Sequence, residues 1–103
     1  MGNLGFAFSP THPGEVLKDE IEYRGISQKL LAEQMGISYK VLNDILNERR
    51  PLTTATAMMF EAALGVPADS LMRIQFKYNM QVAHQDRKLS ARLAKIRKMV
   101  AAL

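Results

Sequence analysis

The side chains best suited to chemistry in this sequence are polar groups gathered between residues 38 and 43. Ser38 and Asn43 can exchange hydrogen bonds with the edges of bases, and Tyr39 can combine a hydroxyl contact with packing on a thymine methyl. Lys40 can reach guanine or a phosphate. Such residues on the outer face of a short helix are typical of base reading in the major groove of DNA. The segment is therefore a candidate DNA-reading surface.

Residues on either side of this segment are suited to the DNA backbone. Gln28 could anchor a phosphate through its side chain and nearby backbone amides, and Arg49 and Arg50 are natural phosphate contacts. Asp44 and Glu48 in the same stretch argue against strong nonspecific binding by this surface. Tight binding to DNA would therefore need a contribution from dimerisation or from another part of the chain.

Two short helices joined by a tight turn must position these side chains. Ser27 is a suitable cap for a helix over 28–35, Gly36 suits a turn with positive φ, and Ser38 can cap a helix over 39–47. The spacing predicts an inward face made of Leu31, Ala32, Met35, Ile37, Leu42 and Ile45. This is the pattern of a helix-turn-helix, although simple helical packing produces similar spacings.

The rest of the chain also has the periodicity of helices. A first helix is expected from Pro13, capped by His12 and ended by Gly25, and a fourth from a cap at Thr53 or Thr54 to Gly65. Their expected inward residues are Val16, Leu17, Ile21 and Tyr23 in the first, and Ala57, Met58, Phe60, Ala63 and Leu64 in the fourth. Val66-Pro67 leads into a fifth helix, and residues 69–103 form one long helix or two with a bend near 84–87. The sequence thus predicts an all-α fold of five helices with a C-terminal helical extension.

Charge divides the chain unevenly. Residues 1–70 carry six Lys or Arg against nine Asp or Glu, whereas residues 71–103 carry eight against Asp86 alone. We expect a flexible segment over 1–11, a DNA-binding domain over 12–78 and a basic amphipathic extension over 79–103. The extension has an apolar stripe with heptad-like steps, made of Leu89, Leu93, Ile96, Val100 and Leu103.

The extension has two competing interpretations. Its basic face could hold phosphates or an acidic partner while the stripe packs in a dimer. Alternatively, the charged face is simply solvated and the stripe docks on the core of the same protein. Binding to a membrane surface is a weaker third interpretation, because residues 79–103 contain no bulky aromatic side chain.

The composition argues against several other functions. The chain has no cysteine, and His12 and His84 lack partners at metal-ligand or catalytic-triad spacing. We find no phosphate-binding glycine loop, so we expect no enzyme activity, cofactor or small-molecule substrate. No apolar run is long enough to span a membrane, which predicts a cytoplasmic protein. Met58, Met59 and Phe60 are interpreted as core residues rather than as a binding groove.

Residues 13–72 resemble the Cro/cI-like (XRE) helix-turn-helix family. The motifs THPGEVLKDEI, GISQKLLAEQMGIS, LNDILNERRPLTTATAMMFEAALG and PADSLM are more narrowly similar to the HigA/VapI group of plasmid-maintenance antidote proteins. The resemblance implies an antitoxin that neutralises a HigB/RelE-type toxin and, as a homodimer on a palindromic operator, represses its own operon. It also implies DNA contacts by Gln28, Ser38, Tyr39, Lys40 and Asn43. Tyr39, where a small or polar residue is usual, and the basic extension depart from the pattern.

Two other functions remain open at this stage. One is a stand-alone transcriptional regulator of the same fold with no toxin partner. The other is a helical protein-binding module that never contacts DNA, for which we would expect no salt-dependent DNA binding.

Overall fold

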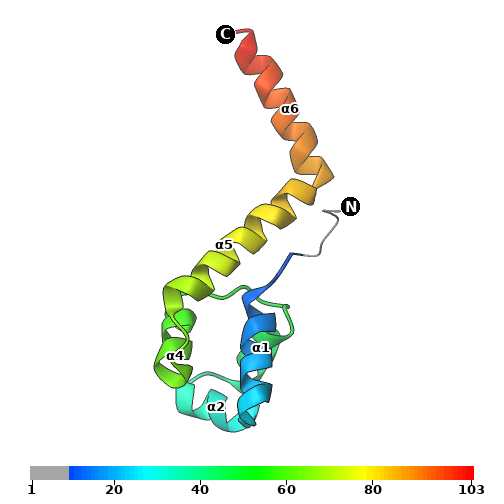
Figure 1. Cartoon of the computed structure of the whole chain (residues 1–103). Helices are drawn as coiled ribbons and strands as arrows, with labels where there is room; N and C mark the ends of the chain where they lie inside the picture. The colour runs from blue at the N-terminus through cyan, green and yellow to red at the C-terminus, as the bar shows by residue number, and fades with distance from the viewer. Residues whose placement is uncertain (1–9) are drawn as a thin grey trace, which may run out of the picture. The chain divides into compact units, whose positions relative to one another are not determined.

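The computed structural model describes residues 10–103, so most of the predicted flexible segment over 1–11 lies outside the described residues. The described residues form six helices and no strand (Figure 1). They are α1 (Pro13–Arg24), α2 (Gln28–Met35), α3 (Tyr39–Leu46), α4 (Thr54–Leu64), α5 (Ala68–Gln85) and α6 (Arg87–Ala101). The predicted all-α class is confirmed, and α6 lies within the stretch 79–103 that was predicted as a helical extension. Residues 11–76 form one compact unit, and the residues from 77 onward belong to a second.

Local signals in the sequence set the ends of the first four helices. Ser27, Ser38 and Thr53 each accept a hydrogen bond from a backbone amide of the helix that follows. Gly36 has a φ of 75°, which a residue with a Cβ rarely adopts, and it ends α2 as predicted. Helix α3 ends one residue before the predicted boundary, with Asn47 as its cap.

The C-terminal third consists of two helices rather than one. Asp86 interrupts the helical run, and its Oδ1 accepts a hydrogen bond of 3.1 Å from the amide of Leu89. This confirms the predicted alternative with a bend near 84–87. The predicted division between residues 78 and 79 falls inside α5 and stays a prediction.

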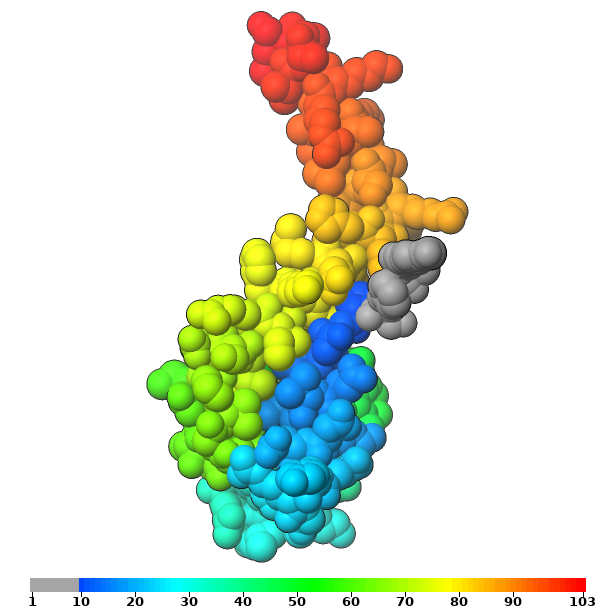
Figure 2. Space-filling model, viewed as in Figure 1, coloured from blue at the N-terminus to red at the C-terminus, as the bar shows by residue number. Residues whose placement is uncertain are grey.

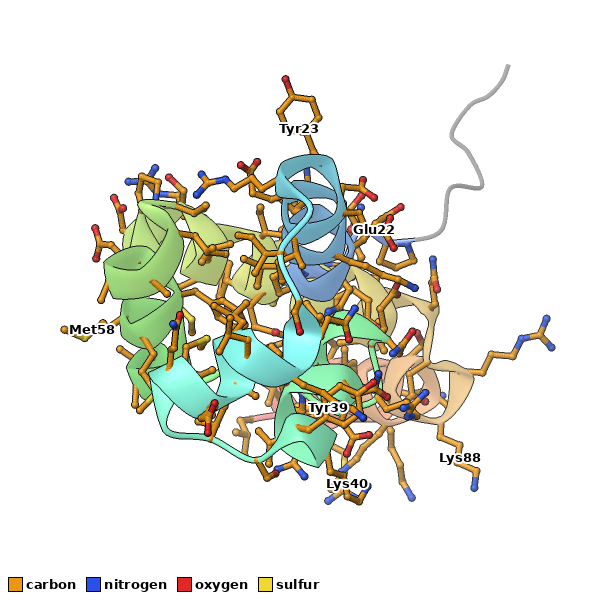
Figure 3. The ribbon with its side chains drawn as sticks, turned by 90° about the horizontal axis from the view of Figure 1, so that it is seen from below. Glu22, Tyr23, Tyr39, Lys40, Met58 and Lys88 are labelled. Atoms are coloured by element: carbon orange, nitrogen blue, oxygen red, sulfur yellow. The ribbon has the colours of Figure 1, made fainter. Side chains whose placement is uncertain are left out.

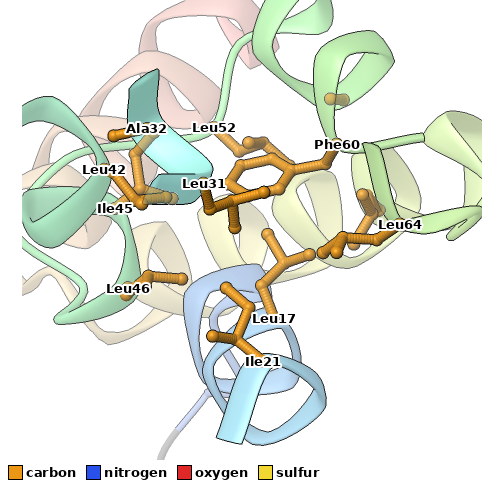
Figure 4. Close-up of a cluster of buried hydrophobic side chains, with 12 residues drawn as sticks. Leu17, Ile21, Leu31, Ala32, Leu42, Ile45, Leu46, Leu52, Phe60 and Leu64 are labelled. Carbon is orange, nitrogen blue, oxygen red and sulfur yellow. The ribbon is translucent and has the colours of Figure 1, made fainter. Parts of the chain in front are cut away.

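A single apolar core holds the helices of residues 11–76 together (Figure 4). Phe60 is fully buried, and leucine and isoleucine side chains from the neighbouring helices surround it. The core residues are Leu17, Ile21, Leu31, Ala32, Leu42, Ile45, Leu46, Leu52, Ala57, Phe60, Leu64 and Leu71. Met35 and Ile37, predicted to face inward, are partly buried against this core. In the space-filling view, the side chains of this unit cover the core on the visible face (Figure 2).

Several predicted inward residues are not buried. Tyr23 is 90% exposed and Val16 38%, because the buried stripe of α1 runs through Leu17 and Ile21. Tyr23 follows Ile21 by two positions, which turns it about 200° around the helix. Met58, at 58% exposure, likewise lies off the buried stripe of α4.

The other two predictions for α4 are corrected for the same reason. Ala63 is exposed, and Met59 is 38% exposed, so the interpretation of Met58 and Met59 as core residues is wrong. Met59 instead lines an open groove of about 280 Å³ between α2 and α4, together with Gln34, Met35, Ala62 and Ala63. A helix packed on one side buries only a narrow stripe, and Ala57, Phe60 and Leu64 fill that stripe.

Helices α1 and α3 approach each other closely at Gly14. A Cβ on Gly14 would overlap the carbonyl oxygen of Ile45, so only glycine fits there. His12 precedes it, and its Nδ1 accepts a hydrogen bond of 2.9 Å from the amide of Gly14, which confirms the predicted cap. The His-Pro-Gly entry to α1 therefore fixes where α3 sits.

Candidate nucleic-acid interface

Helix α3 has one face in the core and one face open to solvent. Leu42, Ile45 and Leu46 are buried, and on the other side Tyr39 is 44% exposed and the Lys40 side chain 80%. Figure 3 shows Tyr39 and Lys40 together on one side of the molecule, with Tyr23 and Met58 pointing elsewhere. The outer face of α3 is thus open to solvent and presents a tyrosine and a lysine.

The start of α3 presents the first predicted base-reading groups. The Ser38 hydroxyl oxygen accepts a hydrogen bond of 3.0 Å from the Val41 amide, and its own hydrogen can still be donated. The Nζ of Lys29 on α2 lies 5.8 Å from the centre of the Tyr39 ring, within the range of a cation–π contact. Lys29 is a residue of this surface that the sequence reasoning missed.

A single carboxylate gathers the cations at this surface. The Oδ2 of Asp44 lies 3.1 Å from the Nζ of Lys40 and 3.6 Å from a terminal nitrogen of Arg50, and its Oδ1 lies 3.2 Å from the Nε of Arg49. The Nη2 of Arg49 also donates a hydrogen bond of 2.8 Å to the Oδ1 of Asn43. Four of the predicted contact residues therefore meet around Asp44.

The charge of Asp44 is held by these contacts. The hydrogen bond from Lys40 lowers the pKa of the Asp44 carboxyl below its usual value, against the opposing effect of burial, and Arg49 lowers it further. From its charge alone, Asp44 is expected only to oppose DNA binding. The spacing of Lys40 and Asp44 by four residues on one helix was the signal for the ion pair.

The turn after α3 brings Arg49 and Arg50 next to Asp44. Glu48 has a φ of 63°, the left-handed conformation that helix ends commonly adopt at this position. The amide of Arg49 donates to the carbonyl of Asp44 at 2.8 Å, and the amide of Glu48 to that of Ile45 at 3.1 Å. This reversal places Arg49 and Arg50 within reach of Asp44.

His12 supports the same turn from α1. Its imidazole is 2% exposed and forms a hydrogen bond with the backbone of Arg50, in addition to capping α1. Burial lowers its pKa below the usual value, although Glu48 and the Arg50 bond act in the opposite direction. His12 is therefore a buried structural group that holds the turn in place.

The other residues considered from the sequence lie outside the cluster around Asp44. Gln28 is half-buried at the first position of α2, directly after the Ser27 cap. His84 is exposed on α5. No residue of α6 is buried, and none of its Lys or Arg side chains has an ion-pair partner within residues 10–103. Both interpretations of the extension, a stripe that packs in a dimer and a stripe that docks on the core of the same protein, stay predictions.

Within residues 10–103, no group of three or more His, Asp or Glu side chains is placed to hold a metal ion. Among those same residues, no helix combines the length and apolar character that crossing a bilayer requires.

Comparison with known proteins places this surface in a family. A helix-turn-helix family model matches residues 17–71. Virulence-associated protein I of Dichelobacter nodosus is 34% identical over 77 residues, which cover 74% of this chain and 71% of that protein.

Two solved structures are similar over most of the chain. The antitoxin HigA of Pseudomonas aeruginosa, solved with the higBA promoter, is 31% identical with a TM-score of 0.70, over 74% of this chain and 84% of that one. An addiction module antidote protein of the HigA family from Coxiella burnetii is 27% identical with a TM-score of 0.74, over 85% and 95%. These matches confirm the resemblance to the HigA/VapI group.

Proposed function

Because this chain belongs to the helix-turn-helix family, we propose that it is a sequence-specific DNA-binding repressor that reads the major groove with α3. The observation that carries the proposal is the outer face of α3, which presents polar and cationic side chains while the opposite face is locked into the core. The similar antitoxin solved with promoter DNA supports it.

The residues of the surface have separate roles in this proposal. Ser38, Tyr39 and Asn43 contact base edges, and Lys40 contacts guanine or a phosphate. Arg49 and Arg50, just beyond the end of α3, contact the phosphate backbone and fix the register of the helix. Gln28, at the start of α2, anchors a phosphate on the other side of the turn.

We further propose that the chain is the antitoxin of a HigB/RelE-type toxin and represses its own operon. The similarity to a HigA antitoxin and to an addiction module antidote protein supports this assignment. The protein binds as a homodimer to a palindromic operator whose half-sites lie about one helical turn, or ~10 bp, apart.

The DNA-reading role is tested by titrating the protein with the DNA upstream of its gene. We expect Tyr39→Ala and Asn43→Ala each to weaken operator binding by about 1–3 kcal/mol, or roughly 5-fold to 150-fold, since each removes a base contact. Tyr23→Ala is the matched control, because Tyr23 is 90% exposed and points away from the α3 face. Unchanged operator preference in both α3 variants would refute the base-reading assignment.

The antitoxin role needs a separate test. Each small reading frame found adjacent to the gene is expressed alone and together with this chain, and the absence of any such frame would favour the stand-alone regulator. We expect growth arrest in the first case, rescue in the second, and co-purification of the two proteins. If this chain binds DNA but does not rescue growth, the stand-alone regulator is favoured. If it binds another protein but shows no salt-dependent binding to DNA, the protein-binding module is favoured.

A further inference from the structure

The recognition surface contains an acidic residue that its proposed function does not use. Asp44 lies on α3 among the side chains proposed to contact DNA, yet its own side chain is only 11% exposed. Three cations of that surface, Lys40, Arg49 and Arg50, lie within 3.1 to 3.6 Å of its two carboxylate oxygens. Those cations are much more exposed, at 80%, 59% and 46% of their side chains. DNA can therefore reach the cations but hardly reaches the carboxylate.

This arrangement weakens attraction to DNA in general. Nonspecific binding comes almost entirely from Lys and Arg near phosphates, and its strength follows the charge they present. A carboxylate shared by three cations reduces that charge wherever the protein meets DNA. The cost is the same for every sequence, so by itself it lowers affinity without selecting a site.

The same carboxylate also fixes geometry, which matters only at the correct sequence. The guanidinium of Arg49 bridges Asp44 and Asn43, through Nε at 3.2 Å to the first and Nη2 at 2.8 Å to the second. The orientation of the Asn43 amide therefore depends on Arg49, which in turn is held by Asp44. Because the Asn43 amide and the Arg49 guanidinium are already ordered, they lose less conformational entropy when they bind the DNA sequence that matches them.

We propose that Asp44 is a specificity-determining positioning residue, which weakens attraction to DNA of every sequence but holds Lys40, Arg49 and Asn43 in the arrangement that fits only the operator. This inference rests on the proposed DNA-reading function of α3. Asp44 itself contacts no base in this proposal, and it acts through the side chains around it.

The test compares Asp44→Asn with the wild-type chain on two duplexes. One is the sequence that the wild-type chain enriches from a randomised DNA pool, and the other is a shuffled duplex of the same composition. Asp69→Asn is the matched control, because it makes the same change of charge at a side chain that is 71% exposed on α5 and paired with Arg73. Each dissociation constant is measured over a series of KCl concentrations, after thermal melting has shown that the variants fold.

We expect Asp44→Asn to bind the shuffled duplex roughly 5-fold to 10-fold more tightly, with a salt dependence steeper by about one ion. The ratio of enriched to shuffled affinity should fall about 10-fold, because both duplexes gain the same charge attraction while only the enriched one loses the preordered Asn43 and Arg49 side chains. Asp69→Asn should leave that ratio unchanged. Equal ratios in the Asp44 variant and the control would overturn the proposal.

A second variant separates charge from position. Asp44→Glu keeps the negative charge but carries it on a longer side chain, so we expect the wild-type salt dependence together with a partial loss of the affinity ratio. If Asp44→Glu instead shows the steeper salt dependence of Asp44→Asn, the charge argument is wrong. If the wild-type chain enriches no sequence at all, the proposed function fails, and the inference fails with it.

Discussion

Replacing Gly14 by alanine should destabilise the protein, although the same change in an exposed helix usually stabilises it by about 1 kcal/mol. The new Cβ would overlap the carbonyl oxygen of Ile45 and lie 3.0 Å from both the carbonyl carbon of Ile45 and the Nδ1 of His12. Since the obstacle is backbone, α1 must move away from α3. Overpacking of this kind costs about 1–3 kcal/mol, and loss of the His12 cap about 1 kcal/mol more.

The net loss is therefore about 2 kcal/mol, which corresponds to a fall in Tm of roughly 10–15 °C for a domain of this size. Thermal melting and urea unfolding followed by circular dichroism would measure it. Gly25→Ala is the control, because Gly25 has a φ of 67° and no atom within 4 Å of its added Cβ. That variant should lose only about 1 kcal/mol from the left-handed backbone. A Gly14→Ala protein as stable as the wild type, or more stable, would refute the close approach of α1 and α3.

Three further changes test other parts of the structure. Glu48→Gly should raise the free energy of unfolding by about 0.5–1 kcal/mol, because the φ of 63° strains a residue with a Cβ. Chemical denaturation measures this free energy, and an unchanged or lower value in the variant would contradict the prediction. Gln75→Met should lower it by about 1–3 kcal/mol, because the buried Oε1 of Gln75 accepts a hydrogen bond of 2.7 Å from the Leu52 amide; no loss in urea unfolding would contradict this. For His12, whose pKa burial lowers, the unfolded chain takes up a proton near pH 6.5 before the folded chain does, so stability should fall as the pH drops through that value. His12→Asn keeps a capping oxygen but cannot titrate, and an equally steep loss between pH 7.5 and 5.5 in that variant would show that another group is responsible.

Local interactions made much of this fold predictable. The caps Ser27, Ser38 and Thr53 satisfy amides three residues away, and Gly36 ends α2 through its own backbone conformation. Such contacts involve only residues close in the sequence, so residue type and spacing are enough to find them. The outer face of α3 followed from the same periodicity, since its apolar partners lie on the same helix.

The errors arose where burial depends on distant segments. Tyr23 and Met58 have the apolar character of core residues, and only the packing of the other helices left them exposed. Gly14 belongs to a family motif, but the need for glycine there comes from the carbonyl of Ile45, about thirty residues away in the sequence. A helix cannot reveal which narrow stripe it buries until its neighbours are in place.

By itself, the sequence predicted the first four helices with their caps, a helical C-terminal third of either one helix or two, and the polar face of α3 that is proposed to read DNA. Only the tertiary structure decided how the charges of that face are arranged. A reversal of the chain at Glu48 brings Arg49 and Arg50 back to Asp44, which a helical pattern cannot predict because the turn is neither helical nor glycine. The ion pairs of Asp44 with Arg49 and Arg50 depend on this path of the chain through space, whereas the pair with Lys40 follows from a spacing of four residues on one helix.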